Sequence, residues 1–135
     1  MYRYLDRELA TLDETEQMLV RAMRDWVVAR QRGRCPTDSV LMRFLSHRLI
    51  GGLEPFHQVM TLLSARGLQR LEIGCPCTST VTEGEAILLS VMRSKMQDSA
   101  AWAEQVAGLL PDRGRQIAAD ALGELSAALA LAGLA

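Results

Sequence analysis

The sequence predicts a single all-α domain, a bundle of about six helices, from three observations. The chain has 135 residues, a length that fits one domain. Hydrophobic residues make up 49% of it but aromatic residues only 4%, so its core must consist of the small and aliphatic side chains typical of packed helices. Apolar residues also recur at steps of three and four. We therefore expect one helical domain over 1–135, with 1–10 as a flexible N-terminal segment.

The first two helices are predicted from their start and stop signals. Thr11 and Glu14 have the spacing of a capping box, and helical periodicity follows, which predicts a helix over about 12–31. A second helix is expected from about residue 37 to the glycines at 51 and 52, which tolerate the backbone angles of a helix end.

The middle of the chain predicts a third helix followed by a loop. Pro55 fits the first turn of that helix, where a missing amide is harmless, and Gly67 ends it. Residues 68–73 suit a short extended segment. The run 74–80 holds glycine, proline and hydroxyl residues, which favour turns, so we expect an irregular loop there.

Three further helices are predicted after this loop. Thr82 and Glu85 form a second capping-box pattern, which opens the fourth helix. A short helix restarts at Asp98 or Ser99. A last, alanine-rich amphipathic helix follows the break at Pro111.

The charge balance argues against a general nucleic-acid binder. The chain carries 15 basic and 16 acidic residues, so it lacks the positive footprint that nucleic-acid binders show. Arginines do gather between residues 21 and 48, and a DNA-binding regulator that uses Arg43, Arg48 and Arg66 is our third hypothesis. The segment after the glycines at 51 and 52 has no basic residue before Arg66, so we do not expect nucleic acid as a partner.

The sequence favours a cytoplasmic location without a membrane span. The N-terminal residues contain no apolar signal core. The charge-free C-terminal stretch 125–135 is shorter than the roughly 20 residues needed to cross a bilayer. Three cysteines, an odd number, indicate reduced thiols rather than a disulfide framework.

Cys75-Pro76-Cys77 is the local motif with the most chemistry. Two thiols separated by one rigid residue can bind one metal ion or face each other as a redox pair. With Cys35 and His57 they could supply the four ligands of a zinc or iron site. The alternatives are a strained, readily reduced disulfide and simple packing as small apolar groups. We expect no cofactor, and metal binding is the alternative.

The segment Leu71–Cys77, followed by the acidic, leucine-rich segment Thr82–Leu89, resembles a family of small uncharacterised proteobacterial proteins with a Cys/Pro cluster before such a helix. The resemblance implies a compact cytoplasmic helical domain and no catalytic residues.

The preferred function from sequence is therefore a non-enzymatic interaction or regulatory protein. No phosphate-binding loop, nucleophile elbow or paired catalytic carboxylates appear. We expect a homodimer or a protein partner, with Met18, Met23 and Trp26 of the first helix as the interaction face. The alternative is a cysteine-based metal-binding or redox-sensing protein.

Overall fold

The protein is all-α, as predicted. The computed structural model describes residues 4–66, 71–94 and 109–133, and in these ranges it contains five α-helices and no strand. The helices are α1 (Glu14–Gln31), α2 (Pro36–Ser46), α3 (Leu53–Arg66), α4 (Glu83–Ser94) and α6 (Asp112–Leu131). Short 3-10 turns at Leu9–Thr11 and Ile50–Gly52 precede α1 and α3. The short helix expected near residue 98 lies outside the described residues, as do residues 68–70 of the expected extended segment.

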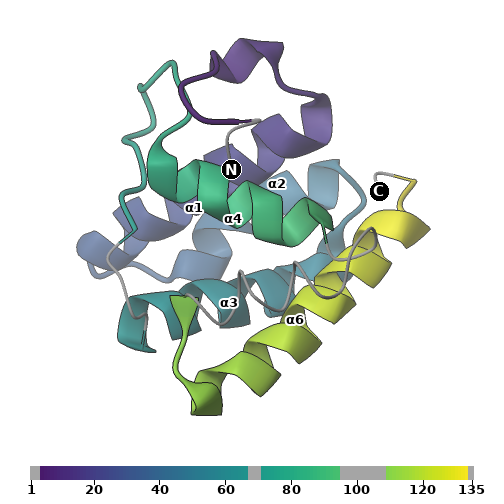
Figure 1. Ribbon diagram of the computed structural model, residues 1–135. Helices are drawn as coiled ribbons and strands as arrows, with labels where there is room; N and C mark the ends of the chain where they lie inside the picture. The colour runs from purple at the N-terminus through teal and green to yellow at the C-terminus, as the bar shows by residue number, and fades with distance from the viewer. Residues whose placement is uncertain (1–3, 67–70, 95–108, 134–135) are drawn as a thin grey trace.

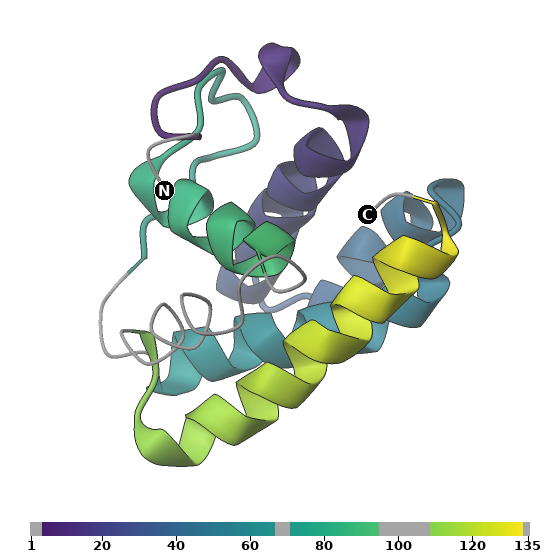
Figure 2. The ribbon, with the colours of Figure 1, turned by 45° about the vertical axis from the view of Figure 1, so that its right-hand side comes forward.

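The helices pack as two pairs, which are connected by the contact of α2 with α3 and by α4. The helix α1 packs on α2, and α3 runs beside α6 (Figures 1 and 2). The helix α4 contacts both α1 and α6, so it lies across the two pairs (Figure 1). Among the described helices, none is long and apolar enough to span a lipid bilayer.

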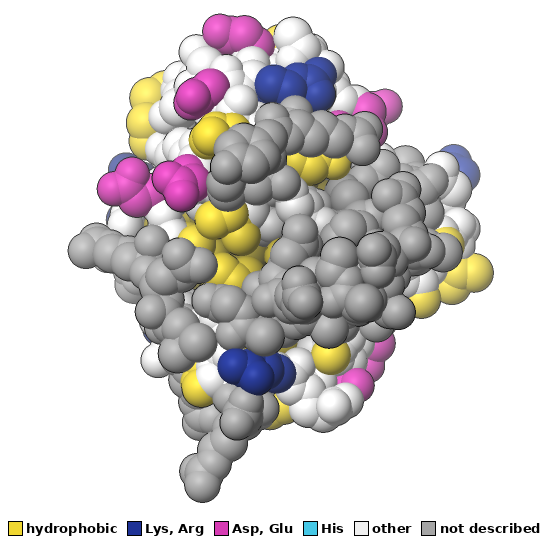
Figure 3. All heavy atoms as spheres, viewed as in Figure 1, with side chains coloured by type: hydrophobic (Ala, Val, Ile, Leu, Met, Phe, Trp, Pro, Cys, Tyr) yellow, Lys and Arg dark blue, Asp and Glu magenta, His cyan; other side chains and the backbone are white. Residues whose placement is uncertain are grey.

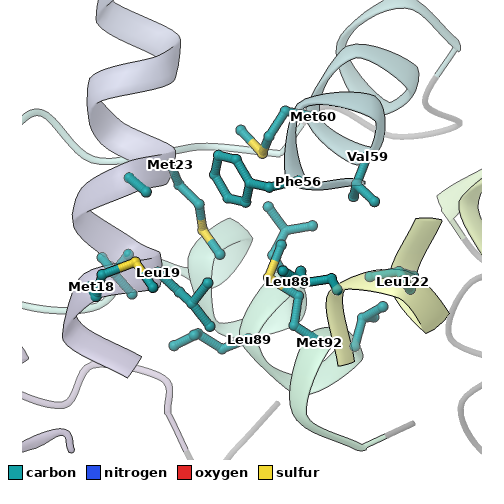
Figure 4. Close-up of a cluster of buried hydrophobic side chains, with 14 of the residues drawn as sticks. Met18, Leu19, Met23, Phe56, Val59, Met60, Leu88, Leu89, Met92 and Leu122 are labelled. Atoms are coloured by element: carbon teal, nitrogen blue, oxygen red, sulfur yellow. The ribbon is translucent and has the colours of Figure 1, made fainter. Parts of the chain in front are cut away.

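The core lies where α1, α3, α4 and α6 meet, and Figure 4 shows it as a cluster of aliphatic and sulfur-containing side chains. Phe44 and Phe56 add an aromatic pair, with ring centroids 5.2 Å apart. Methionines supply several of the remaining contacts, because their unbranched side chains fill irregular gaps. The labelled residues of the cluster are Met18, Leu19, Met23, Phe56, Val59, Met60, Leu88, Leu89, Met92 and Leu122.

The predicted interaction face on α1 is part of this core. Met18, Met23 and Trp26 are only 2%, 0% and 1% exposed, so none of them is presented to a partner. The indole Nε1 of Trp26 donates a hydrogen bond to Nδ1 of His57 over 3.0 Å. The prediction was wrong because the apolar stripe of α1 is covered by the other helices of the same chain.

Residues 4–9 of the N-terminal segment, which the sequence predicts to be flexible, pack against the rest of the chain. Tyr4 and Leu9 are buried. Backbone hydrogen bonds join residues 6–9 to residues 79–81: Leu9 N donates to Ser79 O over 2.7 Å, and the Val81 amide donates to Arg7 O over 2.8 Å. Apolar burial and antiparallel pairing together hold this segment against the loop before α4.

One predicted capping box is present and the other is displaced. Thr82 and Glu85 cap α4: Glu85 N donates to Thr82 Oγ1 over 3.3 Å, and Thr82 N donates to Glu85 Oε1 over 3.0 Å. At α1 the box is formed by Asp13 and Glu16 instead of Thr11 and Glu14. Thr11 ends the preceding 3-10 turn, which moves the helix start to residue 14.

Candidate thiol site

The two neighbouring cysteines lie in a tight exposed turn before α4. The amide of Thr78 donates to the carbonyl of Cys75 over 3.0 Å, which closes a four-residue turn. Pro76 occupies the second position of this turn, where its fixed φ is favourable. Cys75, Pro76 and Cys77 are all exposed, so the turn presents both thiols to solvent.

The sulfur atoms of this turn are in direct contact. Cys75 Sγ lies 3.0 Å from Cys77 Sγ and 3.1 Å from Thr78 Oγ1. The sulfur–sulfur distance exceeds the roughly 2.05 Å of a disulfide bond, so the cysteines form a dithiol. With Cys75 as the thiolate, both neighbours can donate their protons to its sulfur.

These contacts separate the acidities of the two thiols. The hydrogen bonds from the side chains of Cys77 and Thr78 lower the pKa of Cys75 to about 7. The same interaction raises the pKa of Cys77 above its ordinary value, because its proton is shared with a sulfur that carries negative charge. The thiolate form at neutral pH is therefore more favoured at Cys75 than at Cys77.

Arg24 of α1 donates hydrogen bonds to the backbone of the loop that carries the two cysteines. Its Nη1 donates to Thr78 O over 2.6 Å, and its Nη2 donates to Thr80 O over 3.0 Å. The same guanidinium forms a bidentate ion pair with Glu85, with Nε–Oε2 and Nη2–Oε1 distances of 2.7 and 2.9 Å. Arg24 is 1% exposed and Glu85 0%. A planar, always charged guanidinium suits this arrangement because it can donate to several acceptors at once.

Glu85 connects both flanks of the loop. Besides Arg24, its carboxylate accepts hydrogen bonds from the amides of Gly74 and Thr82, over 2.9 and 3.0 Å. Burial alone would raise the pKa of Glu85, but the hydrogen bonds from these three partners and the charge of Arg24 outweigh it and lower the pKa. The carboxylate is thus ionised at neutral pH and fixes the points where the loop begins and ends.

A close backbone approach completes the support of the loop. The hydroxyl of Thr82 donates to Glu72 O over 2.7 Å. A Cβ atom on Gly84 would lie 2.4 Å from the same carbonyl oxygen, a distance that real side chains do not reach. Only glycine therefore allows the first turn of α4 to lie this close to the segment before the cysteines.

A cavity of about 910 Å³ lies beside the turn, between α1, α3 and the segment 71–74. Gly74, the residue immediately before Cys75, is part of its wall. Arg30 lies at the same cavity, with its guanidinium 5.4 Å from the centroid of the Trp26 ring. In the space-filling view, hydrophobic side chains remain visible on the face that carries α4 (Figure 3). The described lining residues are Trp26, Val27, Arg30, Gln31, Met60, Leu63, Ser64, Leu71, Glu72, Ile73, Gly74, Thr82 and Leu88.

The structure brings together two of the four predicted metal ligands. Cys35 precedes α2 and its sulfur contacts Thr37 Oγ1 at 3.1 Å, while Nδ1 of His57 is occupied by Trp26. Within the described ranges, no three histidine, cysteine or acidic side chains are grouped so that they could hold a metal ion. The four-ligand zinc or iron site is therefore not assembled here, and the site consists of Cys75 and Cys77.

The arginines considered for DNA binding have different environments. Arg43 forms an ion pair with Asp25 at 2.6 Å, and Arg48 is exposed. The side chain of Arg66 lies outside the described part of the chain. Arg24, which the sequence places in the same basic region, is instead buried at the thiol site. One sequence signal could have found it: Arg24 follows the apolar Val20 by four positions, on a buried face of α1.

Comparison with protein-family models, with curated proteins and with solved structures gave no match.

Proposed function

We propose that the protein is a thiol–disulfide exchange protein, in which Cys75 is the attacking thiol and Cys77 the resolving thiol. The observation that carries this proposal is the 3.0 Å contact between the two sulfurs on an exposed turn. The turn is anchored by the buried pair of Arg24 and Glu85. An anchored turn keeps the resolving thiol beside the attacking thiol, which favours the second step of exchange.

The reaction balances without a cofactor. The Cys75 thiolate attacks one sulfur of a substrate disulfide; that S–S bond breaks, and its electron pair leaves with the first substrate thiolate. Cys77 then loses its proton and attacks the Cys75 sulfur, which releases the second substrate thiolate. The substrate is reduced by two electrons, and the protein becomes an intramolecular Cys75–Cys77 disulfide. Both released thiolates take up protons from solvent.

The acidity and exposure of the two thiols support these roles. An attacking thiol works best with a pKa near the ambient pH, and the pKa of Cys75 is about 7. Cys77 keeps its proton until the mixed disulfide has formed. Each exchange consumes the protein's own dithiol, so a further exchange requires an external thiol reductant. A reducing cytoplasm would regenerate the dithiol.

The test is to trap the mixed disulfide in a Cys35→Ser background, which leaves only the two site cysteines. The Cys77→Ser variant should accumulate one substrate thiol on Cys75, measured as an added mass on the intact chain. The Cys75→Ser variant should accumulate far less at pH 7, and the protein with both thiols should release the adduct. Equal trapping by both single variants, or a persistent adduct with both thiols present, would overturn the proposal.

The second candidate function is the protein–protein interaction expected from the sequence, through a surface other than the one predicted on α1. Met42 and Leu45 of α2 and Ile50 after it are 69%, 46% and 49% exposed, which is high for large apolar side chains. A homodimer formed through this surface is predicted to become monomeric in a Met42→Glu, Leu45→Glu variant, as measured by native mass. A native mass of one chain before substitution would refute it.

A further inference from the structure

We infer that the cavity beside the turn binds one half of the disulfide substrate, and that this half carries an aromatic or branched apolar group next to a single carboxylate. The inference rests on the proposed function, because the cavity is assigned the substrate of the Cys75 thiolate. It adds the substrate class and names Arg30 as the residue that selects it.

The first support is that the residue before Cys75 lines the cavity. Gly74 forms part of the wall, and Cys75 is the next residue. Cys75 itself does not line the cavity, so a substituent on the sulfur that it attacks would enter the cavity past Gly74. The Gly74 amide donates to Glu85 over 2.9 Å, which fixes the backbone of the cavity wall at the residue before Cys75.

The second support is the size of the cavity and the apolar part of its lining. A volume of about 910 Å³ is within the roughly 300–1,000 Å³ of pockets that bind small molecules. Seven of its thirteen described lining residues carry apolar side chains and five carry polar or charged ones. Val27, Leu63 and Ile73 are only partly buried, so their apolar surface remains available to a ligand. Their burial by an apolar substituent would be favourable.

The third support is the charge at the edge of the cavity. Arg30 is exposed and forms no ion pair with any carboxylate in the part of the chain that the structure describes. Its guanidinium lies over the buried Trp26 ring, which holds the cation at the cavity edge, where its N–H groups can pair with a carboxylate. Glu72 also lines the cavity and would repel a second negative charge, which limits the ligand to one carboxylate on this half.

The test compares the initial rates at which Cys75 reacts with three disulfides in the Cys35→Ser background. Dithiobis(nitrobenzoic acid) carries an aromatic carboxylate on each half, dithiodipyridine is aromatic and uncharged, and cystamine is a small aliphatic cation. The Arg30→Gln variant should react about tenfold more slowly with the nitrobenzoate, equivalent to the loss of one charge-assisted contact. Its rate with dithiodipyridine should not change.

The matched control is Arg32→Gln, which removes the same charge from an exposed arginine close to Arg30 that does not line the cavity. This control should retain the original rates with all three disulfides. Equal slowing by Arg30→Gln and Arg32→Gln would show that the lower rate comes from long-range electrostatics, which would overturn the inference. Equal slowing of the nitrobenzoate and dithiodipyridine reactions by Arg30→Gln would overturn it as well.

A second pair of variants tests the cavity itself. Ser64→Trp places a large side chain on an exposed lining position of α3, whereas Gln58→Trp does so on the same helix outside the lining. Only Ser64→Trp should slow both aromatic disulfides and leave cystamine unaffected. If Cys75 reacts with no disulfide, the proposed function fails. If it reacts with all three but neither Arg30→Gln nor Ser64→Trp changes selectivity, only the cavity inference fails.

Discussion

Arg24 on α1 and Glu85 on α4 are 61 positions apart in sequence and form a bidentate ion pair in the protein interior, with distances of 2.7 and 2.9 Å. The guanidinium also binds the carbonyls of Thr78 and Thr80, and the carboxylate binds the amide of Gly74. One buried pair therefore joins two helices and positions the loop that carries the thiols.

Replacement of Arg24 by methionine should destabilise the fold by about 3–5 kcal/mol, because it leaves the buried carboxylate of Glu85 without its cation. The free energy of unfolding in urea measures this. Arg21→Met is the matched control: Arg21 lies on the same helix but is exposed, and its loss should cost at most about 0.5 kcal/mol. Similar values for the two variants would show that the buried pair does not support the fold.

The pH dependence of stability follows from Glu85. Its pKa in the folded protein lies below the ordinary value of 4.5, so the unfolded chain takes up the proton first as the pH falls. The stabilisation is complete above pH 4.5 and is lost as the pH falls from there through the folded pKa. Urea unfolding at a series of pH values should therefore show the Glu85→Gln variant losing less stability across this window than the unsubstituted protein. Parallel curves would contradict this assignment.

Alanine substitutions at two glycines, each in the first turn of a helix, should change the stability of the protein in opposite directions. Gly84→Ala places a Cβ 2.4 Å from the carbonyl oxygen of Glu72, so the backbone must move, at a cost of about 1–3 kcal/mol. At Gly114 of α6 the nearest atom is 3.6 Å away, so alanine fits and should stabilise the helix by up to about 1 kcal/mol. Thermal unfolding of both variants checks the pair. A harmless Gly84→Ala would show that the close approach of α4 is not required.

The reactivity of Cys75 should depend on Cys77. The rate of Cys75 alkylation should rise with a midpoint near pH 7, because the thiolate is the reacting form. Cys77→Ala removes the strongest hydrogen bond to that thiolate and should move the midpoint to higher pH. Cys75→Ala should lower the midpoint of Cys77, because the negatively charged neighbour is gone. Midpoints that stay unchanged would mean that the thiols do not interact in solution.

The sequence was sufficient where the signal was local. The capping box of Thr82 and Glu85 could be predicted because its spacing alone defines it. The exposed turn at 74–80 could be predicted from its glycine and proline. The contact between Cys75 and Cys77 was one of the alternatives left open, and the turn closed by Thr78 favours it.

The rest of the site depends on tertiary contacts that local patterns do not encode. Arg24 belongs to a basic stretch, and nothing in its neighbourhood indicates a carboxylate 61 positions later. The apolar stripe of α1 has the same sequence pattern whether other helices cover it or not. The burial of Met18, Met23 and Trp26 therefore depends on how α3 and α4 pack against α1. Pairing of residues 6–9 with 79–81 is similarly long-range.

The central claim, that Cys75 and Cys77 form one reversible redox pair, is tested most directly by equilibrating the Cys35→Ser protein in a series of glutathione redox buffers. The fraction of chains with a Cys75–Cys77 disulfide is then measured by peptide mass. We predict one reversible two-electron transition, at a potential less negative than the roughly −300 mV below which structural disulfides lie, because the ring is small and exposed. Chains that remain reduced, or that carry only glutathione adducts or intermolecular disulfides, would contradict the account.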